Sequence, residues 1–266
     1  MKRTEPDTKD EQKPLLSPTA RNGLDKKLIG ACIEGKVTTI EECLRKGANV
    51  DAKTGRTALS KACKEGCNMA VVTALLGAGA DANFRDKKGK TPLMLAVKSR
   101  HLALVQALLL RPEKPGLHVV DKKGRPPLLV AIRNGNHDIV KTLLAAGADK
   151  DKGDELDGLC PLSYAILVER TDAFDLLLKM GADPENSDSA GCTPLMHACE
   201  EENRHAVEAL LGRGARVDGT DSDGRSAIAH AHDNKEIIDL LKAADKKTTP
   251  CPSVEAGNPH KDGGAP

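Results

Sequence analysis

One short motif returns along this chain at a nearly constant interval, and that interval limits what the chain can fold into. The motif, best written Thr-Pro-Leu, stands at residues 57–59, 91–93, 126–128, 160–162, 193–195 and 226–228, so that successive copies are 34, 35, 34, 33 and 33 residues apart. An alanine follows the last motif position by three residues in every copy, and Ala31 fits the same slot in a degenerate first unit. A regular period means that one structural unit is copied, and each residue is interpreted by its position in that unit.

The copy between residues 122 and 151 shows what the unit is. Pro127 suits the first turn of a helix, where a missing N–H costs nothing, and Asn134-Gly135-Asn136 ends that helix. A second helix is predicted from about His137, and Gly147 ends it in the left-handed conformation that glycine adopts without penalty. Its apolar stripe has helical spacing and consists of Ile139, Val140, Leu143 and Leu144. The unit is therefore a pair of short helices.

Two such short helices cannot bury both of their apolar faces against each other, so neighbouring copies must stack into a solenoid. The Thr-Pro-Leu motif, the internal alanine, the glycine between helices and a Gly-Ala-Asp element at 79–81, 147–149 and 181–183 resemble the ankyrin repeat. Weaker forms of the last element occur at 47–49 and 214–216. The resemblance implies an all-α ankyrin-repeat solenoid of helix–turn–helix units with protruding hairpin loops, whose concave groove binds other proteins.

The period divides the chain into an array and two ends. Seven units are predicted, at about 23–52, 53–86, 87–121, 122–156, 157–188, 189–221 and 222–245. Residues 1–22 and 246–266 are rich in polar residues, Pro and Gly, and are predicted to be disordered tails. Because no apolar stretch is long enough for a signal peptide or a membrane span, an intracellular protein of the cytoplasm or the nucleus is expected.

Two departures from the family pattern bear on stability. The slot after Thr-Pro-Leu, where the resemblance implies a histidine bonded to the threonine hydroxyl, holds Ser60, Met94, Leu129, Ser163, Met196 and Ala229. Each lost hydrogen bond is expected to cost about 1 kcal/mol. The third unit has residues 111–116 in place of Gly-Ala-Asp, so an irregular outer loop is predicted there.

The cysteines are predicted to be core residues and not disulfide partners. Cys32, Cys63 and Cys199 all follow the slot alanine, where other copies carry Val97, Ile132 and Ile166. Stacked helices lie about 8–10 Å apart, which exceeds the roughly 7 Å between Cα atoms that a disulfide tolerates. Reduced thiols agree with a cytosolic or nuclear address.

Several apparent sites are explained by the repeat. Residues 77–82 spell GxGxxA, but they follow a helix and not a strand, which argues against a dinucleotide cofactor. His197, Cys199 and His205, with the acidic run 200–202, lack zinc-ligand spacing, and side chains two apart on a helix do not face each other. Cys63 and Cys67 are separated by a helix-breaking glycine. His230 and His232 are also two positions apart, so they are not expected to bind one metal ion together. We therefore expect no cofactor, no metal ion and no enzyme activity.

Charge at the outward-facing positions changes sign along the array. Residues 53–134 contain 16 Lys and Arg against 5 Asp and Glu, a net charge of +11, whereas residues 137–245 contain 11 against 23, a net charge of −12. The predicted partner-binding residues lie in the basic half, with three apolar residues beyond it: Lys53, Arg56, Lys64, Lys87, Lys88, Lys90, Lys98, Lys122, Lys123, Arg125, Arg133, Leu159, Leu167 and Val168. A groove of one charge sign attracts oppositely charged partners.

These features predict a non-enzymatic adaptor or regulator that binds an acidic or phosphorylated segment of another protein along units two to four. The plainer interpretation is that Lys87, Lys88 and their equivalents are solvated turn residues. A second hypothesis is polyanion binding, to nucleic acid or anionic lipid, although the three aromatic residues offer little base stacking. A third is salt-sensitive self-association, in which the basic end of one solenoid docks on the acidic end of another.

Overall fold

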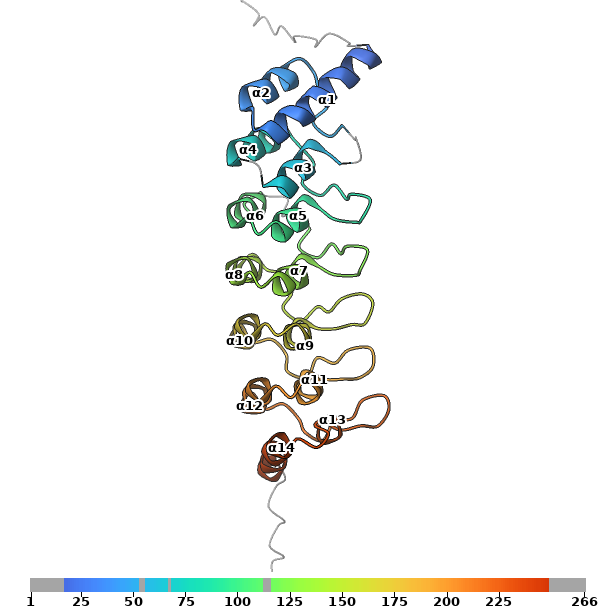
Figure 1. Ribbon diagram of the computed structural model, residues 1–266, viewed down its shortest axis with the longest axis vertical. Helices are drawn as coiled ribbons and strands as arrows, with labels where there is room; N and C mark the ends of the chain where they lie inside the picture. The colour runs from blue at the N-terminus through green and yellow to red at the C-terminus, as the bar shows by residue number, and fades with distance from the viewer. Residues whose placement is uncertain (1–16, 53–55, 67, 112–115, 249–266) are drawn as a thin grey trace, which may run out of the picture.

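The computed structural model describes residues 17–52, 56–66, 68–111 and 116–248, and within these ranges the named elements are all α-helices stacked in chain order along one long axis (Figure 1). The odd-numbered helices form one column, the even-numbered helices form a second, and the hairpin loops protrude beyond the odd-numbered column. The bounds are α1 Pro18–Glu34, α2 Val37–Arg45, α3 Ala58–Glu65, α4 Met69–Gly77, α5 Pro92–Lys98, α6 Leu102–Leu109, α7 Pro127–Asn134, α8 His137–Ala145, α9 Pro161–Leu167, α10 Thr171–Lys179, α11 Pro194–Glu200, α12 Arg204–Gly212, α13 Ala227–His230 and α14 Lys235–Thr248. The predicted all-α solenoid is confirmed.

The repeated motif sets where the odd-numbered helices begin. The Thr91 hydroxyl accepts a hydrogen bond from the Met94 amide at 3.3 Å, and Pro92 follows in the first helical turn. In the copy at 122–151, α7 begins at Pro127 as predicted. Gly135, in the left-handed conformation with φ 63°, caps its C-terminal end, and α8 follows from His137. Both predicted helices of that unit are confirmed.

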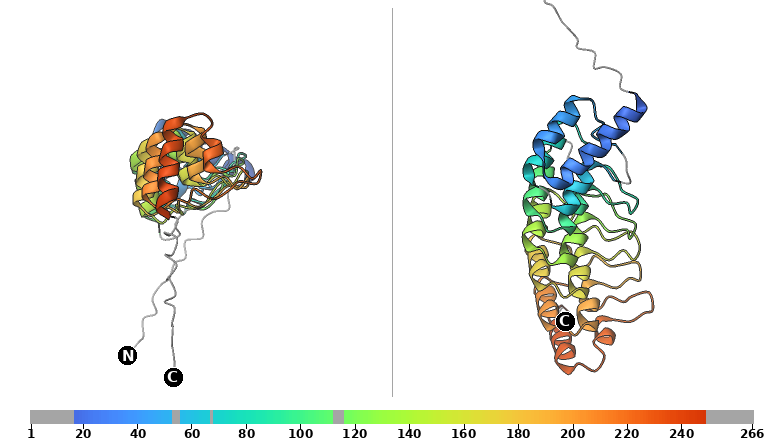
Figure 2. Two further views of the ribbon diagram at one scale, coloured as in Figure 1. Left: turned by 90° about the horizontal axis from the view of Figure 1, so that it is seen from below. Right: turned by 45° about the horizontal axis from the view of Figure 1, so that its top comes forward.

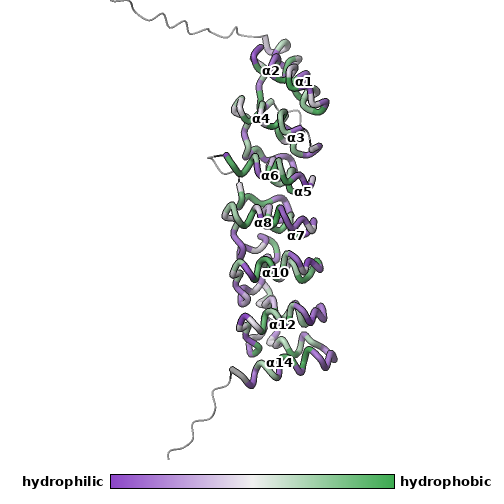
Figure 3. Tube along the Cα trace, turned by 90° about the vertical axis from the view of Figure 1, so that its left-hand side faces the viewer, coloured by the Kyte–Doolittle hydropathy of each residue, from purple (hydrophilic) through white to green (hydrophobic). Residues whose placement is uncertain are grey.

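The core lies between the two columns and runs the length of the stack. Helix α5, for example, packs against α6, the other helix of its pair, and against α7, the next helix of its own column. The slot alanines are buried, and their small side chains let helix backbones approach closely: Ala62, Ala96, Ala131, Ala165, Ala198 and Ala231. Cys32, Cys63 and Cys199 are buried among them, as predicted. Figure 3 shows apolar and polar residues alternating along the even-numbered helices, as expected for helices with one face in the core.

The ends of the array differ from the prediction. Helix α1 begins at Pro18, inside the segment predicted to be a tail, because Ser17 caps it by accepting from the Ala20 amide at 3.3 Å. Helix α14 likewise continues to Thr248, past the predicted boundary at 245. The polar composition of these residues predicted tails at both ends. A polar segment can nevertheless extend a helix when it has a cap and an adjoining helical turn. The rest of the predicted tails, 1–16 and 249–266, and residues 112–115 of the irregular loop lie outside the described residues.

The protruding loops are joined to one another by backbone hydrogen bonds. The Lys122 amide donates to the Lys88 carbonyl at 3.1 Å, the Glu155 amide to Gly124 at 3.0 Å, and the Ser222 amide to Ala190 at 2.9 Å. Figure 2 shows the loops as a parallel series on one side of the stack. Glycine is required where loops meet, because Gly124 has φ +68° and an added Cβ would lie 2.7 Å from the Glu155 nitrogen. The primary role of the lysine-rich segments is therefore structural, because they form the turns that join one hairpin to the next.

The predicted loss of hydrogen bonds after Thr-Pro-Leu is wrong at two serines. The Thr57 hydroxyl donates to Ser60 Oγ at 3.1 Å in a buried setting. The Cys160 thiol is 3.4 Å from Ser163 Oγ in the equivalent positions of unit five. A serine hydroxyl reaches the capping side chain from the slot where the family pattern has histidine, so these two units keep a bond that the expectation had removed.

Candidate functional site

Five of the predicted binding residues meet at one pocket between units two and three. The pocket has a volume of about 300 Å³ and opens between the hairpin loops and the C-terminal ends of α3 and α5. Leu95 forms apolar lining and Ser99 a polar edge. The cationic residues that line it are Arg56, Lys64, Lys88, Lys90 and Lys98. The structure thus brings together side chains that lie up to 42 positions apart in the sequence.

Arg56 is held in place by the first residue of the following hairpin. Its Nε and a terminal nitrogen lie 3.1 Å and 3.0 Å from Asp86 Oδ2, and the Asp86 side chain is only 2% exposed. Burial opposes ionisation of Asp86, but hydrogen bonds from the Lys90 and Lys88 amides and from Arg56 outweigh it, so the pKa of Asp86 is lowered. The carboxylate therefore stays ionised and anchors Arg56 at the pocket wall.

The other cationic side chains of the pocket lie close together, and they outnumber the acidic side chains that pair with them. Burial and the nearby Lys98 ammonium lower the pKa of Lys90, although Asp121 and Asp86 oppose the shift. Lys64 Nζ pairs with Glu65 at 2.5 Å, and Ser99 Oγ donates to the Lys64 carbonyl at 2.6 Å, which joins the ends of α3 and α5. A bound anion would relieve the repulsion between Lys90 and Lys98. The pocket is therefore suited to a carboxylate or a phosphate group.

The other predicted basic residues lie outside this pocket. Arg125 donates to Asp121 Oδ2 at 2.9 Å and its side chain is 12% exposed, so it stabilises its own hairpin. Lys53 lies outside the described residues. The remaining four are exposed on hairpin loops or at the end of α7: Lys87, Lys122, Lys123 and Arg133.

The predicted apolar anchors are less accessible than expected. Leu159, Leu167 and Val168 are half-buried, and Val168 packs against the core. Leu156, on the hairpin loop that precedes α9, is 66% exposed and was not predicted from the sequence. Its position in the loop, where the two preceding hairpins carry Lys88 and Lys123, is the sequence signal that distinguishes it.

A second cavity, of about 530 Å³, lies between α8 and α10 on the even-numbered column shown in Figure 3. Its rim carries both signs of charge, with Lys141 and Lys179 facing Asp172 and Asp175, and Met180 supplies exposed apolar surface. The mixed charge gives it no comparable preference for an anion.

The metal-ligand set considered from the sequence does not assemble. Cys199 points into the core, and burial raises the pKa of its thiol to about 12. His205 pairs with Asp175 at 2.7 Å, and His197 pairs with Asp188 at 2.9 Å. The contact between His197 and Asp188 of its own hairpin was not predicted from the sequence.

Comparison with known proteins agrees with this architecture. A family model described as ankyrin repeats, three copies, matches residues 28–116, 108–188 and 162–250. The chain is 31% identical over 170 residues to a putative ankyrin repeat protein, YahD, of Escherichia coli, covering 61% of this chain and 83% of that protein. It is also 37% identical over 92 residues to a tyrosine-protein kinase of Hydra vulgaris, but spans only 12% of that protein. Within the described residues, no helix is long and apolar enough to cross a membrane.

Two solved structures show the same fold. The ankyrin repeat domain of Bcl-3, described as a unique member of the IkappaB protein family, has a TM-score of 0.76 and 25% identity, with 81% of this chain and 97% of that chain covered. The human ASB11 ankyrin repeat domain has a TM-score of 0.65 and 26% identity, with 82% and 96% covered. Ankyrin repeats generally mediate interactions between proteins and are typically non-catalytic. The family match along most of the sequence, together with the stacked helix pairs, shows that this chain belongs to the ankyrin repeat family.

Proposed function

We propose that this chain is a non-catalytic adaptor that binds an acidic or phosphorylated segment of a partner protein across units two to four. The observation that supports it best is the meeting of Arg56, Lys64, Lys88, Lys90 and Lys98 at one pocket. Buried thiols such as Cys43 and Cys199 suit a reducing compartment, so we extend the proposal to the cytoplasm or the nucleus.

The geometry favours a peptide over a larger polyanion. The pocket holds about one anionic group, and the exposed Lys87, Lys122 and Lys123 continue the positive charge along the neighbouring loops. Residues 137–245 carry a net charge of −12 and would repel a long nucleic acid laid along the same stack. A short segment with one phosphate in the pocket and acidic residues beside it avoids that repulsion.

The proposal is tested by fluorescence anisotropy with the full chain and three labelled probes: a short acidic peptide with one phosphoserine, the same peptide without phosphate, and a single-stranded oligonucleotide. The variant combines Lys88→Glu and Lys98→Glu, both on exposed side chains. We expect it to weaken binding of the phosphopeptide at least about tenfold, because a charge-assisted hydrogen bond contributes about 1.5–3 kcal/mol.

The matched control combines Lys235→Glu and Lys242→Glu, which changes the net charge by the same amount at exposed positions of α14. The control is expected to bind the phosphopeptide as the unaltered chain does. Equal loss in both variants would mean that only total charge matters, and tighter binding of the oligonucleotide than of the phosphopeptide would favour the polyanion hypothesis instead.

A further inference from the structure

The first aspartate of most hairpins has a cationic partner for its inward-facing oxygen. Asp86 Oδ2 pairs with Arg56 at 3.0 Å, Asp121 Oδ2 with Arg125 at 2.9 Å, and Asp221 Oδ2 with an Arg225 nitrogen at 2.9 Å. The other oxygen accepts hydrogen bonds from backbone amides of the turn, as Asp86 Oδ1 does from the amides of Lys88 and Lys90. The buried carboxylate is thus neutralised within the hairpin or by its neighbour.

Units five and six depart from this arrangement, and in unit five Leu159 stands at the position of the cation. Cys192 stands at the hairpin position that Lys90, Arg125 and Arg225 occupy in other units. Among the residues that the structure describes, Asp188 has no Lys or Arg partner, and its Oδ2 instead lies 2.9 Å from His197 Nε2. A thiol stands in place of the cationic side chain, whereas the imidazole contact also occurs in unit seven, where His230 Nε2 lies 2.9 Å from Asp221 Oδ2.

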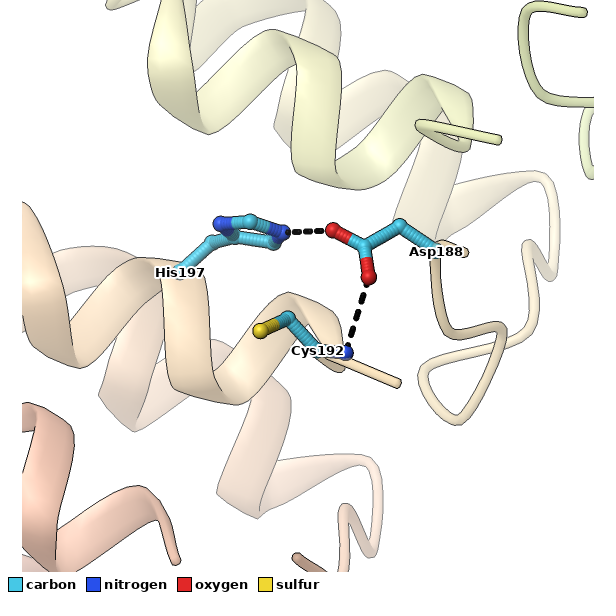
Figure 4. Close-up of side chains that lie close together, drawn as sticks. All are labelled: Asp188, Cys192 and His197. Carbon is cyan, nitrogen blue, oxygen red and sulfur yellow. Dashed lines mark hydrogen bonds and ion pairs between the residues drawn. The ribbon is translucent and has the colours of Figure 1, made fainter. Parts of the chain in front are cut away.

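Figure 4 shows these three side chains close together: His197 and Asp188 point toward each other, and the Cys192 side chain lies beside them. One ligand atom of each, the Cys192 sulfur, an Asp188 oxygen and a His197 nitrogen, lies within 4.8 Å of the others. Cys192 is 7% exposed, His197 8%, and the Asp188 side chain 9%. The group is therefore pre-assembled and shielded from solvent, and α11 and the turn fix it from two sides.

The donor set has a clear metal preference. Sulfur, imidazole nitrogen and carboxylate oxygen are the ligands of Zn²⁺, with bonds of about 2.0–2.3 Å, so donor atoms around a tetrahedral ion lie about 3–4 Å apart. Small side-chain adjustments bring the present spacing into that range. A thiolate selects against Mg²⁺ and Ca²⁺, which prefer oxygen ligands.

The charges also balance. The Cys192 thiol releases one proton to solvent as it binds, Asp188 is an anion, and His197 binds through Nε2 as a neutral ring with its proton on Nδ1. With Zn²⁺ the buried group is neutral overall, which is what a site with little access to water requires. A neighbouring group of Cys192, Asp221 and His230 is also within 4.8 Å, but Arg225 already neutralises Asp221 there.

We propose that Asp188, Cys192 and His197 bind one zinc ion, which takes the role of the missing hairpin cation and ties the hairpin of unit six to α11. The site lies away from the basic pocket, so it is independent of the proposed partner binding.

The test uses the full chain without an affinity tag, after treatment with a chelator. Calorimetric titration with Zn²⁺ is expected to show one ion per chain, and the midpoint of thermal unfolding is expected to rise with zinc because the ion binds the folded state. With Co²⁺ as a spectroscopic probe, a thiolate-to-cobalt charge-transfer band is expected. The Cys192→Ser variant should lose that band and bind Zn²⁺ at least about tenfold more weakly.

Two further variants keep the result interpretable. Cys199→Ala, in the same helix as His197, removes a buried thiol outside the group and should retain both the band and the affinity. Cys192→Arg restores the residue that units four and seven carry, so it should stay folded and lose its response to zinc. No zinc binding by the unaltered chain, or binding and a cobalt band that persist in Cys192→Ser, would overturn the proposal.

Discussion

Contact between successive hairpins can be tested by adding a single methyl group at two matched glycines. Gly124 and Gly224 occupy the same hairpin position, with φ of +68° and +76°. Alanine at either position destabilises the fold because it must adopt the left-handed conformation, although it also lowers the entropy of the unfolded chain. The net loss is about 1 kcal/mol. Only Gly124 faces a following hairpin, whose Glu155 nitrogen would lie 2.7 Å from the new Cβ, whereas Gly224 has nothing within 4 Å. Displacing that hairpin breaks the 3.0 Å bond from the Glu155 amide to the Gly124 carbonyl, which adds about 1–2 kcal/mol.

The free energy of unfolding is measured by urea titration, followed by the helical circular dichroism signal, for Gly124→Ala and Gly224→Ala in parallel. We expect a loss of about 2–3 kcal/mol for the first and about 1 kcal/mol for the second. Equal losses would contradict the reasoning, because they would show that backbone conformation alone accounts for the cost and that the hairpins do not depend on one another.

Three more outcomes follow from individual side chains and from the charge at the pocket. Ser60→Ala should lower the free energy of unfolding by about 1 kcal/mol in the same titration, because the Thr57 hydroxyl loses a buried acceptor. The pKa of Asp221 is about 2 against an ordinary 3.8, since hydrogen bonds from the Arg225 amide and from His230 outweigh the effect of burial. A lowered pKa means that this stabilisation is complete above about pH 4 and is lost as the pH falls through about 2, so thermal midpoints of Asp221→Asn should fall less with acid than those of the unaltered chain. Phosphopeptide affinity measured by anisotropy should decrease as salt rises, because charges at the pocket are screened.

The repeat made most of the fold predictable, because its period fixes both the helix positions and the buried slots. The start of α7 at Pro127 and the burial of Ala131 follow from that pattern alone. The polar start of α1 at Pro18 does not, since it depends on a cap and on no apolar residue. Prediction therefore fails where a helix is set by one local hydrogen bond.

The candidate sites were predictable only in part. Lys88 and Lys98 were identified from their outward-facing positions, but whether they meet depends on how the hairpin lies against α5, the helix that follows it. Arg125 has the same sequence signal, yet it pairs with Asp121 inside its own hairpin. The contact between Asp188 and His197 joins a turn to a helix nine positions away, and no spacing rule for metal ligands covers that pair.

The central claim is that an acidic or phosphorylated segment binds at the pocket between units two and three. The most direct measurement is the change in backbone amide chemical shifts of the nitrogen-15-labelled chain when the phosphopeptide is added. The account predicts that the largest changes lie at Arg56, Lys64 and residues 88–99. Changes centred on residues 137–245, or no saturable change at all, would contradict it.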